Sequence, residues 1–387
     1  MLEKGYCAVA LKRNIMAYKA LYRKYRPQTF DQVVGQEHIT QTLKHQVMSG
    51  NVSHAYLFTG SRGTGKTSTA KIFAKAVNCP NSKNGIPCFE CDVCRALDDA
   101  SNVDILEIDA ASNNRVDEIR DIREKVKFLP VNGKYKVYII DEVHMLTDQA
   151  FNALLKTLEE PPSHIIFILA TTEVHKLPQT ILSRCMRFDF RLIPVNVLTN
   201  LVKTIFEKEN ISCEEEALKL IAIAGEGSAR DTISIADSVS AFSQGNITVQ
   251  SAQRVIGTSD TDEYVKLYNA IWQKNVGEAL NVLSQNYDNG KNMIIFAKNC
   301  TLHARNLLVV KNCPNSSEVN ALTKESKDML AEQAQQIDNY SLMEYMKIFS
   351  SIEAEMKYAL SPKTLIETAI ITAISEVGEE QKKNELN

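Results

Sequence analysis

The segment GSRGTGKT, from Gly60 to Thr67, combines glycines, a lysine and a hydroxyl group at a spacing suited to binding phosphates. It fits the pattern G-x-x-x-x-G-K-[ST] and lies between an apolar run of strand length and a helical pattern. Glycines allow backbone N–H groups to turn toward phosphate oxygens, and a helix that begins there adds the positive end of its dipole. A Gly-rich turn can match by chance, but the flanking strand and helix favour nucleotide binding.

Two side chains of this segment have distinct expected tasks. Lys66 would neutralise the β and γ phosphates, and the hydroxyl of Thr67 would bind Mg²⁺. The expected ligand is therefore ATP with Mg²⁺. The residues expected around its phosphates are Gly60, Ser61, Arg62, Gly63, Thr64, Gly65, Lys66, Thr67 and Ser68.

Two carboxylates, Asp141 and Glu142, end the apolar run KVYIIDE over 136–142. Ligands of open α/β sheets bind at the carboxyl ends of strands. Asp141 is therefore expected to help hold Mg²⁺, and Glu142 to polarise the water that attacks the γ-phosphate. An acidic pair after a strand is also a common helix N-cap, but the phosphate-binding segment favours the catalytic interpretation.

Three further positions are ambiguous from the residues alone. Thr171 or Thr172 ends another apolar run, where a hydroxyl could contact the γ-phosphate, although such a threonine is more often only a turn former. Arg184 in the tripeptide SRC and Arg230 in GEGSARD could meet the charge on a transferred phosphoryl group. A surface salt bridge of little energetic weight explains either arginine equally simply.

Four of the nine cysteines, Cys79, Cys88, Cys91 and Cys94, crowd into one short segment. Their spacing, C-x8-C-x2-C-x2-C, suits a closed tetrahedral Zn²⁺ site with a structural role. The alternatives are a redox CxxC pair, which leaves two cysteines unexplained, and buried free thiols. The other five cysteines are scattered.

The composition limits the class of protein. A chain of 387 residues suits about two to four domains. With 44% apolar and 24% charged residues, a wholly disordered chain is excluded. The net charge of −3 excludes a uniformly basic coat for nucleic acid but not a local basic surface. Without a long apolar stretch or a secretory signal, we expect a cytoplasmic protein that contacts no membrane.

The elements that must position these residues change character along the chain. From about 36 to 190, apolar runs at 55–60, 103–109, 136–141 and 165–171 alternate with helical patterns. This alternation predicts a parallel sheet flanked by helices. After about residue 194 no strand-like run remains, and the pattern is helical.

Together these segments resemble the γ/τ family of bacterial DNA polymerase III clamp-loader subunits. The resemblance lies in segments spanning 18–257, and in helical pattern only over 258–376. It implies an AAA+ fold: an α/β P-loop domain, a small helical lid and an all-α collar. The implied domains are an ATP-binding domain at 16–194 with a zinc-binding insert at 79–94, a lid at 195–257 and a collar for oligomerisation at 258–376. Residues 1–15 would be a disordered extension and 377–387 a polar tail.

The resemblance also implies roles for individual residues. Thr172 matches the residue that senses the γ-phosphate, and Arg184 the arginine finger that completes a neighbouring subunit's ATP site. Arg230 matches the lid arginine that contacts the nucleotide in its own subunit. The four clustered cysteines match the family's zinc ligands, and the residues named above for the phosphates and Mg²⁺ match its nucleotide-binding residues. The adenine side would be formed by Tyr25, Arg26, Pro27 and Val34.

The function that this resemblance implies is an ATPase motor without a polymerase active site. ATP binding would open the ring-shaped β sliding clamp and load it on primed DNA, and hydrolysis would release it. The implied partners are δ, δ′ and further γ/τ copies, the clamp, and DNA bound without sequence preference. The τ form has long C-terminal regions, whereas this chain ends at Asn387, so we expect a γ-length product, a truncated form or a short natural version.

Two other functions remain open at this point. The first is another AAA+ motor on DNA, such as a helicase loader or a branch-migration motor, which the cysteine segment and SRC disfavour. The second is a scaffold subunit that does not hydrolyse ATP, which the intact Lys66, Thr67, Asp141 and Glu142 disfavour.

Overall fold

The computed structural model describes residues 20–99, 102–112, 121–122, 124–243, 245–256, 261–316, 319, 324–356 and 359–385. The extension expected at 1–15 and the last two residues of the expected tail lie outside this set. The chain forms two compact units. The first runs to Ser212 and includes Ile221–Ala241, and the second comprises Cys213–Leu220 and the chain from Phe242.

The first unit is built on a parallel five-stranded sheet with the order β2-β3-β4-β1-β5. Its strands are β1 (Ala55–Thr59), β2 (Ile105–Asp109), β3 (Lys136–Asp141), β4 (Ile165–Thr171) and β5 (Met186–Asp189). Every residue of β1 and β4 is buried, as expected for parallel strands that helices cover on both faces. The α/β class predicted from the sequence is confirmed.

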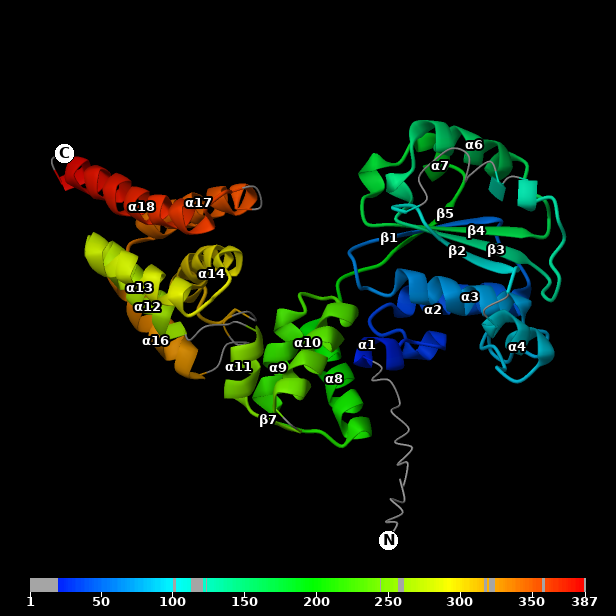
Figure 1. Ribbon diagram of the computed structural model, residues 1–387, viewed down its shortest axis with the longest axis horizontal. Coiled ribbons are helices and arrows are strands. Elements are labelled where there is room, and N and C mark those ends of the chain that lie inside the picture. The colour runs from blue at the N-terminus through cyan, green and yellow to red at the C-terminus, as the bar shows by residue number, and fades with distance from the viewer. Residues whose placement is uncertain are drawn as a thin grey trace, which may run out of the picture. The chain divides into compact units, whose positions relative to one another are not determined.

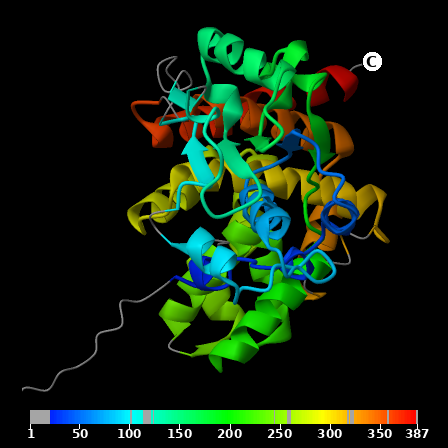
Figure 2. The same cartoon turned by 90° about the vertical axis from the view of Figure 1, so that its right-hand side faces the viewer.

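Helices cover the two faces of this sheet (Figure 1 and Figure 2). On one face, α2 (Glu37–Ser49) and α3 (Lys66–Asn78) pack with Tyr56 and Phe58 of β1. On the other, α6 (Asp148–Glu159) packs with Leu57 of β1, because side chains alternate along a strand. Short elements complete this region: α1 (Leu21–Lys24), η1 (Phe30–Gln32), α4 (Asp92–Asp98), η2 (Val143–Met145), η3 (Val174–Lys176) and α7 (Gln179–Leu182).

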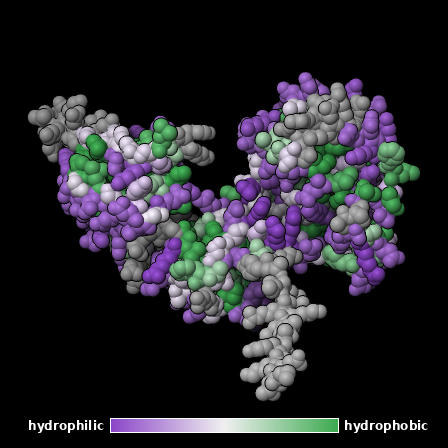
Figure 3. All heavy atoms as spheres, viewed as in Figure 1, coloured by the Kyte–Doolittle hydropathy of each residue, from purple (hydrophilic) through white to green (hydrophobic). Residues whose placement is uncertain are grey.

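The register of the sheet brings its chemically interesting residues to one edge. Parallel pairing places Thr59 opposite Thr171 and Asp109 opposite Asp141, all at carboxyl ends of strands. The phosphate-binding segment leaves β1 at this same edge and enters α3. The surface around the sheet is mainly hydrophilic in the view of Figure 3, with hydrophobic side chains gathered in patches.

Beyond the sheet, the described residues form helices and two short strands. The helices are α8 (Val195–Glu209), α9 (Glu215–Ala224), α10 (Ala229–Ser243) and α11 (Val249–Ile256). The prediction of no strand after 194 was wrong in detail, since the short strands β6 (Ser212–Cys213) and β7 (Asn246–Ile247) lie between these helices. Two residues each are too few to leave an alternating pattern in the sequence.

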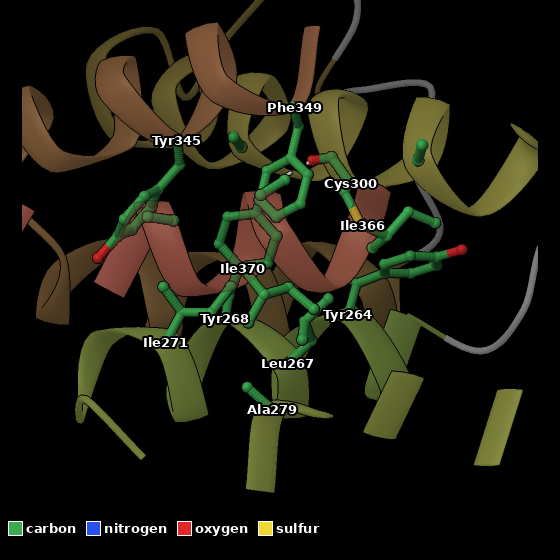
Figure 4. Packing of buried hydrophobic residues seen from close by; sticks show 14 of the residues in the cluster. Tyr264, Leu267, Tyr268, Ile271, Ala279, Cys300, Tyr345, Phe349, Ile366 and Ile370 are labelled. Carbon is green, nitrogen blue, oxygen red and sulfur yellow. Dashed lines mark hydrogen bonds between the residues drawn. The ribbon is translucent and has the colours of Figure 1, made fainter. Parts of the chain in front are cut away.

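In the part of the second unit that the structure describes, the core lies mainly among long helices, where aromatic residues meet (Figure 4). Tyr268 lies 5.8 Å from the ring of Tyr345 and 6.0 Å from that of Phe349, and its hydroxyl donates to the carbonyl of Cys300 at 2.8 Å. The helices are α12 (Thr261–Trp272), α13 (Val276–Asp288), α14 (Met293–Asn312), α16 (Lys324–Gln336), α17 (Asn339–Glu355) and α18 (Pro362–Glu385).

His303 of α14 is a buried imidazole within this core. Its Nε2 lies 2.7 Å from Oε1 of Gln333, and burial lowers the pKa of His303 to about 4. An unfolded histidine has a pKa of about 6.5, so the unfolded chain takes up this proton first as the pH falls. The stabilisation is therefore complete above about pH 6.5 and is lost as the pH falls toward the folded pKa.

We expect this unit to lose about 2 kcal/mol of stability from His303 between pH 7 and pH 5. Urea unfolding followed by the fluorescence of Trp272 measures it, because this single tryptophan packs against the same core. A His303→Gln chain lacks the titrating group and should lose less stability over that range. Equal losses in the two chains would contradict the assignment.

Candidate functional site

Backbone geometry explains the glycines of the phosphate-binding segment. Gly60, Gly63 and Gly65 have φ values of 133°, 76° and 104°, which side-chain-bearing residues rarely adopt. A Cβ on Gly63 would lie 1.9 Å from Oγ of Ser228, and one on Gly60 would lie 2.3 Å from the carbonyl oxygen of Phe190. The segment therefore needs glycine both for its turn and for the close approach of neighbouring chain.

Lys66 lies at the centre of this turn, with 5% of its surface exposed. Its ammonium group donates to the carbonyl oxygens of Gly60 at 2.7 Å and Ser61 at 2.9 Å. Burial lowers the pKa of Lys66, while the nearby carboxylates of Glu142 and Asp141 oppose this shift. A buried cation that donates to backbone carbonyls at a helix N-terminus fits an anionic ligand such as a triphosphate.

Thr67 and Asp141 meet across the edge of the sheet. The hydroxyl of Thr67, in the first turn of α3, donates to Oδ2 of Asp141 at 2.6 Å. A hydroxyl oxygen and a carboxylate oxygen are ligands that suit Mg²⁺ beside phosphates. The two residues that the sequence proposed for Mg²⁺ therefore lie within reach of one ion.

Glu142 follows β3 directly and turns toward β4. Its Oε2 accepts from the backbone N–H of Thr172 at 3.2 Å and from the hydroxyl of Thr172 at 3.0 Å. Thr171 instead is buried and lies 3.0 Å from Nδ1 of His144. Of the two threonines between which the residues alone could not choose, Thr172 is the one that contacts the acidic pair.

His144 joins this group although no motif singled it out. Its Nδ1 lies 3.4 Å from Oε2 of Glu142, and only 8% of its side chain is exposed. The sequence signal that could have found it is the run Asp-Glu-Val-His, which places a histidine two residues after the expected water-polarising acid.

The two arginines are placed differently. Arg230 lies in the first turn of α10, where its N–H donates to the carbonyl of Gly63 at 3.4 Å and its guanidinium lies 5.5 Å from the ring centre of Tyr22. Arg184 follows α7 and donates to Oε1 of Glu159 at 2.7 Å and to the carbonyl of Thr180 at 2.8 Å. Arg230 thus adjoins the phosphate-binding turn, whereas the described contacts of Arg184 lie elsewhere.

The residues expected on the adenine side lie beside α3 and α8. Arg26 donates from Nε to Oγ of Ser68 at 3.1 Å, which joins this segment to the first turn of α3. The hydroxyl of Tyr25 donates to Glu209 of α8, Val34 packs beside Ile193 and Leu198, and Pro27 is half-buried.

The four clustered cysteines converge on one point. Cys79 follows α3, Cys94 lies in α4, and all four sulfur atoms lie within 4.8 Å of one another. Cys79 and Cys88 are 3.5 Å apart, and Cys88 and Cys94 are 3.9 Å apart. Tetrahedral Zn²⁺ with its usual bond length requires sulfur separations of about 3.8 Å. These distances fit a zinc site and are too long for a disulfide.

Backbone N–H groups support the sulfur atoms. The N–H of Cys88 points to Sγ of Cys79 at 3.3 Å, and the N–H of Cys91 to Sγ of Cys88 at 3.4 Å. Backbone donors from Glu90 and Cys91 lower the pKa of Cys88 to about 6, whereas burial raises the pKa of Cys79. Convergence of all four thiols favours a metal site over a redox pair.

We expect about one zinc per chain, and we expect Cys88→Ser to lose it. Because the metal would hold together a segment with little core of its own, the melting temperature should fall by several degrees as well. Metal analysis and thermal unfolding measure both effects. Cys313→Ser is the matched control, since Cys313 is exposed and lies outside the cluster. Zinc retained by the Cys88→Ser chain would exclude this site.

Comparisons with known proteins cover nearly the whole chain. A family model described as DNA polymerase III, delta subunit, matches residues 35–194. A model of the clamp loader subunit ATPase lid domain matches 198–245, and a model of DNA polymerase III subunits gamma and tau domain III matches 247–386.

Individual relatives carry the same names. The DNA polymerase III subunit tau of Bacillus subtilis is 46% identical over 92% of this chain and 63% of its own length. The tau subunit of Escherichia coli is 46% identical over 67% of this chain and 40% of its own length. The subunit gamma of Buchnera aphidicola is 38% identical over 72% of this chain and 76% of its own length. The chain thus spans less than two thirds of the two tau relatives.

Among solved structures, the Thermotoga maritima RuvB Holliday junction branch migration motor is 20% identical, with a TM-score of 0.47 over 64% of this chain and 79% of that chain. That likeness assigns no function. In the part of the chain that the structure describes, no helix has the length and apolar character needed to cross a bilayer.

Proposed function

Because the chain belongs to the family of bacterial DNA polymerase III γ and τ subunits, we propose that it is an ATPase motor subunit of a clamp loader. In this proposal ATP binding opens the sliding clamp for loading on primed DNA, and hydrolysis releases it there. The supporting observation is the meeting of Lys66, Thr67 and Asp141 with Glu142 and Thr172 at one edge of the sheet.

Each residue of this site has a task in ATP hydrolysis. Backbone N–H groups of 60–67 and the ammonium of Lys66 would bind the phosphates, and Thr67 with Asp141 would hold Mg²⁺, which offsets phosphate charge when bound. Glu142 would orient and polarise the attacking water. The hydroxyl of Thr172 donates a hydrogen bond to Glu142 at 3.0 Å. When ATP binds, this hydroxyl would donate to the γ-phosphate instead. ATP binding would thereby change the surroundings of the Glu142 carboxylate.

We extend the proposal to the remaining predicted parts. Arg230 would contact the nucleotide from the lid at 195–257, and Tyr25, Arg26, Pro27 and Val34 would hold the adenine. Cys79, Cys88, Cys91 and Cys94 would hold a structural zinc inside an ATP-binding domain at 16–194. A collar at 258–376 would assemble the chain with δ, δ′ and further γ/τ copies. The chain would also contact the β clamp and primed DNA.

Arg184 is the proposed link between neighbouring chains. Its pairing with Glu159, at 33% side-chain exposure, leaves the guanidinium near the surface. A phosphoryl group on an adjoining chain would be a stronger partner than this exposed carboxylate, because a surface ion pair contributes little. ATP hydrolysis in one chain would thus require Arg184 of the adjoining chain.

We expect Arg184→Ala to lower ATP turnover of the assembled loader about 100-fold while ATP binding is retained. Arg187→Ala is the matched control, since Arg187 is an exposed arginine paired with Asp189. Mixing Arg184→Ala chains with Lys66→Ala chains should restore part of the turnover, because an Arg184→Ala chain supplies an intact phosphate site and an adjoining Lys66→Ala chain supplies the arginine. No recovery in mixed assemblies would contradict action between chains.

Reconstitution with clamp, δ, δ′ and primed DNA tests the whole proposal. ATP-dependent clamp loading, with hydrolysis stimulated by clamp and primed DNA together, is the expected result. A hydrolysis rate that the clamp does not change would favour the alternative that the chain is another kind of AAA+ motor on DNA. Loading that proceeds equally with Lys66→Ala chains would favour a scaffold.

A further inference from the structure

We propose that His144 is a positioning residue for Glu142, which holds the carboxylate in the orientation needed to polarise the attacking water. The inference rests on the proposed ATPase function and adds one residue to its site. His144 occupies η2, the single turn after β3, and it contacts groups at the end of β4.

The ring of His144 is fixed from the side of β4. Its Nδ1 lies 3.0 Å from Oγ1 of Thr171, and that oxygen also accepts from the N–H of Glu173 at 3.0 Å. Thr171 is fully buried as the last residue of a buried strand. The histidine therefore has a rigid anchor that does not depend on Glu142.

The same ring nitrogen faces Glu142. Its distance to Oε2 is 3.4 Å, and an ionised carboxylate can only accept hydrogen bonds. A favourable contact therefore requires the proton on Nδ1, which lies 3.0 Å from Oγ1 of Thr171 and 3.4 Å from Oε2 of Glu142. The ring nitrogen of His144 thus lies between a buried strand end and the carboxylate of Glu142.

The contacts of Glu142 are unequal between its two oxygens. Oε2 receives the N–H and hydroxyl of Thr172 and faces His144. Across the described residues, no hydrogen bond reaches Oε1, which is therefore the oxygen open to a water. When the γ-phosphate takes the hydroxyl of Thr172, His144 and the backbone N–H of Thr172 remain to hold Oε2. Loss of His144 should then act on turnover rather than on nucleotide binding.

Three replacements separate positioning from general packing. His144→Leu removes both ring nitrogens. His144→Asn keeps an amide N–H near the place of Nδ1, and His144→Gln carries its amide farther out, near the place of Nε2. In the assembled loader with clamp and primed DNA, we expect kcat to fall about ten-fold for Leu and Gln, and to recover largely for Asn. KM and the affinity for a fluorescent ATP analogue should stay unchanged.

His175→Leu is the matched control, because His175 is an exposed histidine of the neighbouring turn η3. A wild-type kcat in His144→Leu overturns the inference, as does equal activity of the Asn and Gln chains. A raised KM at constant kcat does so too. If the wild-type loader hydrolyses no ATP, the proposed function itself fails. Lys66-dependent hydrolysis that is indifferent to His144 overturns only the positioning role.

Discussion

Lys66→Ala should lower ATP hydrolysis by the assembled loader at least about 100-fold and abolish clamp loading. Lys66 is 5% exposed, and its ammonium group donates to the carbonyls of Gly60 and Ser61. In such a buried site a positive charge attracts phosphate oxygens more strongly than it would in water. Its removal leaves the charge that develops on the phosphoryl group without this partner. Steady-state ATPase rates and loading of labelled clamp measure the loss.

Lys71→Ala provides the control for this replacement. Lys71 lies five residues farther along α3 and forms a partly exposed ion pair with Glu107 of β2. A surface pair of this kind contributes at most about 1 kcal/mol, so hydrolysis should be unchanged. Comparable defects in the two chains would mean that damage to the helix, rather than loss of the phosphate-binding charge, explains Lys66→Ala.

Glu142→Gln should separate ATP binding from ATP hydrolysis. The amide keeps the shape of the side chain but cannot accept a proton, so kcat should fall by about 10²–10⁴-fold. Affinity for ATP should remain, because Lys66 and the Thr67–Asp141 pair stay intact. Single-turnover hydrolysis and equilibrium nucleotide binding measure the two quantities. The variant should trap the ATP-bound state with the clamp held open.

Glu160→Gln is the corresponding control, since Glu160 is exposed just beyond the end of α6. It should hydrolyse ATP at the wild-type rate. A Glu142→Gln chain that turns over normally would remove Glu142 from the mechanism. A chain that no longer binds ATP would show that Glu142 supports the nucleotide site itself rather than the chemical step.

Most of the candidate site could be predicted from short patterns in the sequence. The residues from Gly60 to Thr67 are contiguous, and the four cysteines proposed to bind zinc lie close together in the sequence. Their spacing alone therefore indicates their chemistry. The pairing of Thr67 with Asp141 was also predictable, because parallel strands bring their carboxyl ends to one edge. The roles of these residues stay predictions until the experiments above are done.

Contacts that depend on register and packing could not be predicted. Thr171 and Thr172 are equivalent as sequence, and only the backbone path at the end of β4 turns one toward His144 and the other toward Glu142. The closeness of Gly63 to Ser228 depends on how α10 packs against the phosphate-binding turn. The resting partner of Arg184, Glu159, depends on the packing of α6 and α7.

One helix connects two sites of different chemistry. The first turn of α3 holds Lys66 and Thr67, and Cys79 follows its last residue. Thirteen residues of α-helix span about 20 Å, more than twice the distance over which physiological salt screens charges, about 8 Å. Charges that far apart interact weakly through salt water, so a metal held by the four thiols would influence the phosphate-binding turn mainly through this helix. Oxidation or chelation of the thiols would then act on that turn mainly by altering the axis or rigidity of α3.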